Sequence, residues 1–248
     1  MNWPSRRQSL VITRFAALLA ALTVGLGVAG WQIAKSRTYQ AFGELTSRVA
    51  TEHRFIALTF DDGPTPEGVS RLLPVLEDRG VKATFFVTGA EVERHPEAAA
   101  ALVAAGHELG NHSYSHPRMV LLSQSSIASE VERTDELIRE AGQLGDIHFR
   151  PPYGMKALSL PYFLKKTGRR TIMWGLEPDS DSQLASSSSE IAQHVIAHSK
   201  PGDIVLLHVM YRSRRASLEA VPEMIDGLQA RGFHFVTVSE LLASSSPP

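Results

Sequence analysis

The most informative segment for predicting the fold is Phe55-Ile56-Ala57-Leu58-Thr59-Phe60-Asp61-Asp62-Gly63. Its first six residues form a short apolar run with β-branched and aromatic side chains, which is typical of a buried β-strand. Two adjacent carboxylates and a glycine follow at once. Parallel α/β folds bind ligands in the loops after their strands, so Asp61 and Asp62 are candidates for a proton acceptor and a metal ligand. The same residues also suit an ordinary turn, because Asp and Gly are common turn formers.

Six further short runs resemble strands, and they alternate with amphipathic helical patterns. These predicted strands are residues 83–88, 107–111, 147–149, 171–175, 203–208 and 234–238. Apolar stripes at helical spacing occur at Val69, Leu72, Leu73 and Leu76, at Ile127, Val131, Thr134 and Ile138, and at Leu218, Val221, Ile225 and Leu228. Pro74 should kink or shorten the first of these helices. Such alternation predicts parallel strands with helical crossovers, in either an open doubly wound sheet or a closed barrel.

The composition indicates one or two globular domains with a sizeable core. The chain has 248 residues, 43% of them hydrophobic and 21% charged, with 18 Gly and no Cys. These values exclude collagen-like, disulfide-stabilised and wholly disordered proteins. The lack of Cys also excludes thiolate nucleophiles and Cys-ligated zinc. A formal net charge of −1 gives no electrostatic reason to expect nucleic acid as a partner.

The N-terminal segment differs from the rest of the chain in charge and hydropathy. Residues 1–50 contain six basic residues and one acidic residue, and residues 15–33 carry no charge. This length suffices for a single membrane-spanning helix whose basic flank stays inside the cell. A cleaved signal peptide is the alternative, with Val28-Ala29-Gly30 as its cleavage site, and Ser5-Arg6-Arg7-Gln8-Ser9-Leu10 resembles a twin-arginine export signal. A buried core helix is the third interpretation.

The expected domain organisation follows from this segment. Residues 1–50 hold the basic flank, the anchor or signal helix and a linker, residues 51–242 the globular domain, and residues 243–248 a disordered tail. We expect the globular domain outside the cytoplasm. It would be attached to the cell membrane by a single span, or be secreted or periplasmic after signal cleavage.

Three more polar clusters follow predicted strands. Asn111-His112-Ser113-Tyr114-Ser115-His116-Pro117 places two His four residues apart, and neutral imidazole is a common zinc ligand. Arg150-Pro151-Pro152-Tyr153-Gly154 has a backbone that two prolines make rigid. Leu206-Leu207-His208 ends a buried run with a titratable side chain. Each cluster alone also fits a structural role, as we expect for His194 and His198, which share the spacing without a carboxylate cluster alongside.

Taken together and in order, four motifs resemble those of the polysaccharide deacetylase family, the NodB-like carbohydrate esterases. They are TFDDG at 59–63, HSxxH at 112–116, RPPYG at 150–154 and LLH at 206–208. The resemblance covers roughly residues 53–242 and implies a distorted (β/α)7 barrel. It also implies a metal-dependent hydrolase that removes N-acetyl groups from an amino-sugar polysaccharide, such as peptidoglycan or an exopolysaccharide.

The resemblance also implies a role for each matching residue. Asp62, His112 and His116 match the metal ligands, and zinc is the expected ion, with cobalt or another divalent ion as the alternative. Asp61 matches the catalytic base and Arg150 the residue that orients it. The other implied site residues are the general acid His208, the oxyanion donor Tyr153 through its backbone N–H, and Leu206, which lines the pocket for the acetyl methyl group. Pro151, Trp174 and Tyr211 are further candidates for substrate contacts.

The sequence departs from the family after the fifth predicted strand. Many members carry a DxxDW-like motif there, whose second Asp supports the acid histidine and whose Trp shapes the pocket. Residues 174–182 read WGLEPDSDS instead. Asp179, Asp181 and Glu177 are candidates for the partner of His208, and we expect Asp181 from its position. A polar loop of solvated acids is the alternative.

Two further questions concern the substrate and the activity. Residues 209–215 read VMYRSRR and could bind an anionic glycan at the mouth of a cleft, or form a solvated basic loop. The same catalytic groups would serve an O-acetyl esterase on xylan or another acetylated glycan, which is the second interpretation. The altered fourth motif suggests a third, a non-catalytic glycan-binding protein. Asp61 and His208 together favour an enzyme, because binding alone needs neither a base nor an acid.

Overall fold

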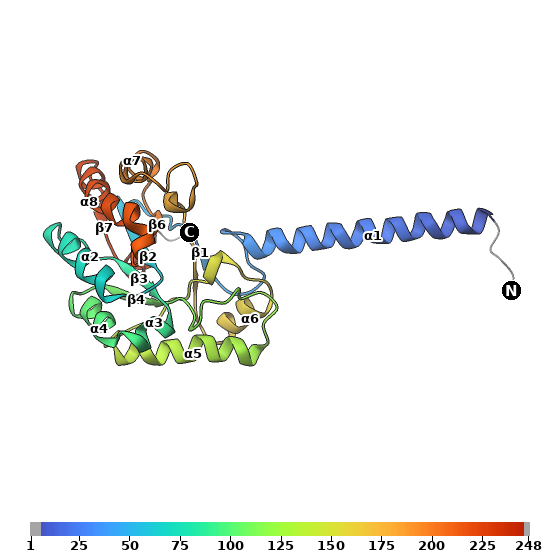
Figure 1. Cartoon of the computed structure of the whole chain (residues 1–248), viewed down its shortest axis with the longest axis horizontal. Helices are drawn as coiled ribbons and strands as arrows, with labels where there is room; N and C mark the ends of the chain where they lie inside the picture. The colour runs from blue at the N-terminus through green and yellow to red at the C-terminus, as the bar shows by residue number, and fades with distance from the viewer. Residues whose placement is uncertain (1–5, 246–248) are drawn as a thin grey trace.

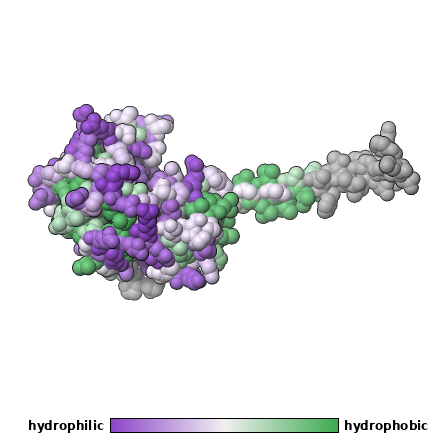
Figure 2. Space-filling view, turned by 60° about the horizontal axis from the view of Figure 1, so that its bottom comes forward, coloured by the Kyte–Doolittle hydropathy of each residue, from purple (hydrophilic) through white to green (hydrophobic). Residues whose placement is uncertain are grey.

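The computed structural model describes residues 6–245 (Figure 1). A long helix, α1 (Arg6–Lys35), extends from an α/β domain formed by the rest of the chain. Ala17–Lys35 has a mean hydropathy of 1.7 and is the one stretch of the described chain that is long and apolar enough to cross a membrane. Figure 2 shows this apolar helix beside a largely hydrophilic domain surface. These features agree with the predicted anchor or signal helix. The export-type motif that begins at Ser5 and the predicted tail both lie partly outside the described residues.

The centre of the domain is a parallel sheet. Its strands run in the order β4-β3-β2-β6, and β7 pairs with the first residues of β2. The strands are β2 (Phe55–Asp61), β3 (Thr84–Val87), β4 (Glu108–Asn111), β6 (Ile204–His208) and β7 (His234–Phe235). The named strands pair in parallel, as the strand–helix alternation predicts. The register places Asp61 beside His208 and so brings together two motifs that are far apart in sequence.

The remaining strands complete a distorted barrel. β1 (Leu45–Thr46) pairs in parallel with β5 (Thr171–Ile172). Single bridges continue the pairing around the ring, from Asn111 to Phe149, from Phe149 to Thr171, and from Leu176 to Val205. The ring therefore passes from β4 through Phe149 to β5 and then to β6.

Some strands differ from the sequence prediction. Of residues 147–149 only Phe149 forms β-bridges. The pairing does not extend past Arg150, because the two prolines at 151–152 have no N–H to donate. β5 and β7 are each two residues long and thus shorter than predicted. β1 lies in the segment predicted to be a linker, where the carbonyl oxygen of Thr46 accepts a hydrogen bond of 2.8 Å from the N–H of Met173.

Helices cover the outside of the barrel (Figure 1). They are α2 (Pro66–Asp78), α3 (Gly89–Arg94), α4 (Pro96–Ala104), α5 (Gln124–Glu140), α6 (Ser159–Lys166), α7 (Ser188–His198) and α8 (Arg215–Ala230). The last helix, α9 (Val238–Ala243), packs instead in a second buried cluster with Ala57 and Phe86, on the opposite face of the strands. The predicted apolar stripes of α2, α5 and α8 are buried, apart from the half-buried Leu73. α2 is not shortened at Pro74, because Pro74 and Ser70 lie on its exposed side, where water can bond to the Ser70 carbonyl group. His194 and His198 stack on α7 with ring centroids 4.3 Å apart.

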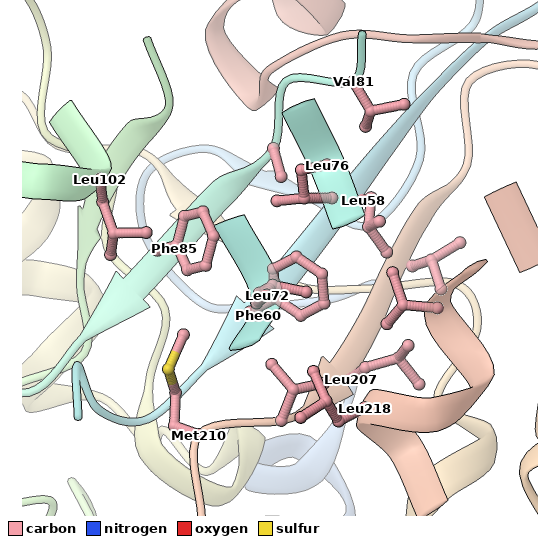
Figure 3. Close-up of a cluster of buried hydrophobic side chains, with 14 of the residues drawn as sticks. Leu58, Phe60, Leu72, Leu76, Val81, Phe85, Leu102, Leu207, Met210 and Leu218 are labelled. Carbon is pink, nitrogen blue, oxygen red and sulfur yellow. The ribbon is translucent and has the colours of Figure 1, made fainter. Parts of the chain in front are cut away.

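A hydrophobic core between the sheet, α2 and α8 fixes the strands that carry the polar motifs (Figure 3). The rings of Phe60 on β2 and Phe85 on β3 lie 5.1 Å apart. Leu72 from α2, Leu207 from β6 and Leu218 from α8 pack in the same cluster. Burial of each such side chain contributes roughly 2 kcal/mol. The ends of β2 and β6 are therefore held on a rigid base.

Candidate active site

Four polar segments meet at the carboxyl ends of the barrel strands. Asp61 is the last residue of β2 and lies opposite His208, the last residue of β6. His112 directly follows β4, and Arg150 directly follows the bridge at Phe149. Parallel α/β domains carry their ligand-binding loops at this end. The topology therefore explains why motifs that are distant in sequence converge.

Asp62, His112 and His116 form a cluster of three potential metal ligands. Their ligand atoms all lie within 4.8 Å of one another. Asp62 Oδ1 is 3.9 Å from His112 Nε2 and 3.5 Å from His116 Nε2. These separations are too long for hydrogen bonds and suit side chains that share one ion, each about 2 Å from it. Asp62 has a φ of 70°, a left-handed conformation that lets the adjacent carboxylates of Asp61 and Asp62 face different partners.

His112 is held in the neutral form that a metal ligand requires. Its Nδ1 lies 2.8 Å from the carbonyl oxygen of Arg150, so we assign Nδ1–H as the donor, which leaves the lone pair on Nε2. Burial lowers the pKa of His112 to about 3, against the opposing charge of Asp62. Two imidazoles and one carboxylate leave open positions on a divalent ion, as catalytic sites do. The residues present therefore fit a divalent metal.

Residues outside the predicted site fix the loop that carries His116. The Asn111 side-chain oxygen accepts the N–H of Ser113 at 2.8 Å, and the Ser113 hydroxyl accepts the N–H of His116 at 3.1 Å. From α5, Glu130 Oε2 accepts two successive loop N–H groups, at residues 114–115, with lengths of 2.9 and 2.8 Å. Glu130 could not be identified from the sequence, because nothing in the local pattern of α5 indicates that this residue faces the loop.

Asp61 is buried against Arg150. Nη1 of Arg150 donates to Asp61 Oδ1 at 2.6 Å and to Thr59 Oγ1 at 2.8 Å. Its Nε and Nη2 each donate at 3.3 Å to the carbonyl oxygens of residues 172 and 173. Burial raises the pKa of the Asp61 carboxyl, and the charge of Arg150 opposes this rise. The second oxygen of Asp61 lies 3.6 Å from His112 Nε2, so the carboxylate borders the ligand cluster.

The partner of His208 is Asp179 and not Asp181. Asp179 is buried, and its Oδ2 accepts the backbone N–H of His208 at 2.6 Å and lies 3.3 Å from His208 Nδ1. Ser217 on α8 donates to the same oxygen at 3.0 Å. A 3-10 turn at Pro178–Ser180 holds Asp179 inward, whereas Asp181 is exposed and accepts an N–H from its own loop. The expectation of Asp181 was therefore wrong, because position in the loop did not reveal this turn.

Asp179 also determines the charge of His208. Burial lowers the pKa of His208, but the hydrogen bond and charge of Asp179, together with the charges of Asp61 and Asp62, outweigh burial and raise it to about 8. The imidazole is therefore protonated at neutral pH. Since Nδ1 faces Asp179, Nε2 is the atom available to donate a proton. A carboxylate and an imidazolium thus stand side by side at the ends of β2 and β6.

The loop after Arg150 is strained and rigid. Tyr153 has a φ of 57°, in the left-handed region that is costly for a non-glycine residue. It follows two buried prolines, of which Pro151 is the first. The exposed Tyr153 ring packs edge-on against His116, with centroids 4.6 Å apart, and the guanidinium carbon of Arg118 lies 5.0 Å from that ring. Strain of this kind is concentrated at functional sites.

The other expected substrate contacts differ in exposure. Leu206 and Trp174 are buried in one hydrophobic cluster. Tyr211 is half-exposed, and partial burial raises the pKa of its hydroxyl to about 12. In the basic segment that follows, Arg212 pairs with Glu67 at 2.9 Å. Arg215 pairs with Glu219 in the same manner, so acidic neighbours already neutralise two of the arginines that were candidates for binding an anionic glycan.

Comparisons with known proteins point to one family. The family model described as polysaccharide deacetylase matches residues 48–172. A peptidoglycan-N-acetylglucosamine deacetylase from Bacillus cereus is 32% identical over 200 residues, which is 81% of this chain and 93% of the relative. A bifunctional xylanase/deacetylase from Pseudobutyrivibrio xylanivorans is 34% identical over 195 residues, which is 76% of this chain and 30% of the relative.

Solved structures give the same result. A carbohydrate esterase family 4 pseudoenzyme from Bacillus anthracis superposes with a TM-score of 0.73 at 28% identity, over 84% of this chain and 72% of that protein. Sequence and fold agree over the region that holds the four motifs. The chain belongs to the polysaccharide deacetylase family.

Proposed function

We propose that the protein is a divalent-metal-dependent hydrolase that removes N-acetyl groups from an amino-sugar polysaccharide of the peptidoglycan or exopolysaccharide type. The observation that carries the proposal is the pairing of Asp61 with His208 beside the Asp62, His112 and His116 cluster. A proton acceptor and a proton donor flank one potential metal site, as amide hydrolysis requires. The similarity to a peptidoglycan deacetylase supports the amino-sugar substrate.

Two groups of residues would prepare the attack on the acetyl carbonyl carbon. Asp62, His112 and His116 would hold the metal, with zinc as the expected ion and cobalt or another divalent ion as the alternative. When bound, the ion supplies a positive charge that polarises the carbonyl group and acidifies water. Asp61 takes the proton of the attacking water. Because Arg150 is buried and makes four hydrogen bonds, the carboxylate keeps one orientation through the reaction.

Three groups would complete the reaction. His208 carries a proton at neutral pH and gives it to the leaving nitrogen, while Asp179 keeps the ring in place. The backbone N–H of Tyr153 donates to the oxygen on which negative charge develops, an interaction typically worth about 3 kcal/mol. Leu206 and Trp174 form the apolar wall that receives the acetyl methyl group.

Removal of O-acetyl groups from xylan or another acetylated glycan is the second candidate activity. The same base, acid and oxyanion donor would serve an ester, and one relative is described as a bifunctional xylanase/deacetylase. A non-catalytic glycan-binding role is the third candidate, since one relative is described as a pseudoenzyme. Asp61 is hydrogen-bonded to Arg150, and His208 to Asp179. The presence of both a fixed carboxylate and a fixed imidazole favours an enzyme, because glycan binding alone requires neither group.

The proposed location is outside the cytoplasm. α1 would be either a single membrane span with its basic flank inside the cell or a signal helix that is removed. Residues 51–242 are the proposed catalytic domain, residues 1–50 the flank, helix and linker, and residues 243–248 a tail. β1 lies within residues 1–50 and contributes a strand to the barrel.

Acetate release by the purified full-length protein tests the proposal. We expect release from N-acetylated amino-sugar oligomers or peptidoglycan, its loss with a chelator, and its recovery when a divalent metal is added back. Acetylated xylan, assayed in parallel, separates the ester activity from the amide activity. Asp61→Asn is the control for contaminating hydrolases. If metal-loaded protein released no acetate from any of these substrates, the non-catalytic candidate would take the place of the enzyme.

A further inference from the structure

The C-terminal end of α1 and the residues directly after it pack against the rim of the site. Ala34 is 2% exposed, and its carbonyl oxygen accepts the N–H of Lys156 at 2.9 Å. Lys156 is itself buried, and its ammonium group donates to the carbonyl oxygen of Ser36. Since Lys156 follows shortly after Tyr153, the end of the helix is fixed to the strained loop of the site.

Arg37 extends this contact to Trp174. Its Nη2 donates to Glu177 Oε2 at 2.8 Å, and Nε1–H of Trp174 donates to the same oxygen at 2.7 Å. The guanidinium carbon of Arg37 also lies 4.9 Å from the centroid of the indole, within the range of a cation–π contact. The indole is therefore held at its edge by Glu177 and on its face by Arg37. Glu177, a candidate partner of His208 from the sequence, serves this contact instead.

Trp174 in turn borders the buried groups of the site. Its centroid lies 5.6 Å from the guanidinium carbon of Arg150, whose Nη1 holds Asp61 at 2.6 Å. A Cβ atom at Gly154 would come within 3.0 Å of the indole, so the ring also packs on the loop at residues 150–154. Displacement of the indole would therefore remove packing contacts beside Arg150 and from this loop.

We propose that Arg37 is a positioning residue of the active site. Through Glu177 it fixes the Trp174 indole, and the segment directly after the membrane-length helix thereby becomes part of the catalytic centre. The effect on turnover rests on the proposed deacetylase activity, whereas the fixing of the indole does not.

The exposure of the Arg37–Glu177 pair indicates that the pair orients the indole and adds little to the stability of the fold. The Arg37 side chain is 45% exposed and the Glu177 side chain 13% exposed. Ion pairs that reach solvent in this way contribute little to stability, because water screens them. The pair therefore acts on orientation, and small displacements near reacting groups reduce turnover far more than they reduce stability.

Arg48 offers a matched control. It lies in the same segment, its side chain is also 45% exposed, and its Nε lies 3.2 Å from Asp203. Asp203 directly precedes β6, at the end of the barrel opposite to His208. Its Oδ1 borders Gly175, but the Arg48–Asp203 pair does not include the hydrogen bonds that hold the Trp174 indole and Arg150. Replacement of either arginine removes one half-exposed ion pair from the same segment. Arg48 also donates to the carbonyl oxygen of residue 201 at 3.2 and 3.0 Å, so its replacement removes further contacts, but none of them is to the Trp174 indole.

The experiment uses full-length protein in detergent micelles with the two other tryptophans replaced (W3F and W31F), so that emission reports Trp174 alone. Arg37→Ala, Arg37→Lys and Arg48→Ala are compared by emission maximum, acrylamide quenching, thermal melting, kcat and KM. We expect Arg37→Ala to shift the emission, to increase quenching and to lower kcat/KM by about tenfold, while Arg37→Lys restores part of each. Arg48→Ala should stay within about twofold of the parent in kcat/KM.

Each outcome either supports or overturns the proposed role of Arg37. Emission and quenching that are the same in Arg37→Ala and Arg48→Ala would overturn the inference, as would a changed emission with unchanged kcat and KM. A parent protein that releases no acetate would count against the proposed function only, because the emission of Trp174 still reports whether Arg37 fixes the indole. Arg37→Lys keeps the test valid if Arg37→Ala fails to fold.

Discussion

Asp179→Asn tests the acid–base pair of the site most directly. The substitution keeps the size of the side chain and removes the negative charge beside His208. Asp179 is 1% exposed, and its Oδ2 accepts the N–H of His208 at 2.6 Å and the hydroxyl of Ser217 at 3.0 Å. An amide oxygen can accept the same hydrogen bonds. The substitution therefore removes only the negative charge of Asp179, which raises the pKa of His208 against the lowering effect of burial. The pKa of His208 should then fall.

The magnitude follows from the pKa of His208, which is about 8 in the native protein. Without the charge of Asp179 we expect a value of about 6.5, a difference of about 2 kcal/mol. At pH 8 the protonated fraction would fall from about one half to about 3%, and kcat/KM by about fifteenfold, but the loss at pH 6 would be less than about twofold. Because the folded-state pKa is raised, the stabilisation from this pair is fully present below about pH 6.5 and is lost as the pH rises through about 8.

The assay is acetate release as a function of pH, together with an NMR titration of the His208 ring. Asp181→Asn is the matched control, because Asp181 is exposed in the same loop and does not contact His208. The basic limb of the profile should move to lower pH in Asp179→Asn and stay in place in Asp181→Asn. A basic limb at the same pH in the parent and in Asp179→Asn would refute the assignment of His208 as the acid.

Three other substitutions test the remaining parts of the site. Asp61→Asn should lower kcat by about 10²–10⁴-fold while elemental analysis finds the metal content unchanged; a loss of metal would instead make Asp61 a ligand. His112→Ala should lower the metal content in the same analysis, and full occupancy would contradict its role as a ligand. Arg150→Met should lower the free energy of unfolding by about 3–5 kcal/mol in urea titrations, because it leaves the Asp61 carboxylate buried without a partner. A loss no larger than that of Arg48→Ala would show that the buried pair does not contribute in this way.

Features that depend on neighbouring residues could be predicted from the sequence. The run that forms β2, the apolar stripes of α2, α5 and α8, and the order of the four motifs are all local patterns. The barrel itself followed from the resemblance to a family, since periodicity is the same in an open sheet and in a barrel. The convergence of Asp61 and His208 then follows from parallel pairing of β2 with β6.

Features that depend on distant partners could not be predicted. Asp179 and Asp181 lie in one polar loop, and only the turn at Pro178–Ser180 distinguishes them. Glu130 reaches the histidine loop from α5, and Arg37 meets Glu177 across 140 positions of sequence. Neither contact leaves a periodic signal. β1 could not be predicted either, because its two residues gain their partners only when β5 is in place.

Arg150 joins the architecture of the barrel to its chemistry. β4 and β5 are connected only by single bridges at Phe149, and beside them the Arg150 side chain bonds to the carbonyl oxygens of residues 172 and 173. A relative without the proposed hydrolytic activity could lose a proposed metal ligand such as His116 with little harm to folding. It could not easily lose either member of the Asp61–Arg150 pair, because the other would remain as an uncompensated charge in the interior. In such a lineage this pair should outlast the activity that it serves.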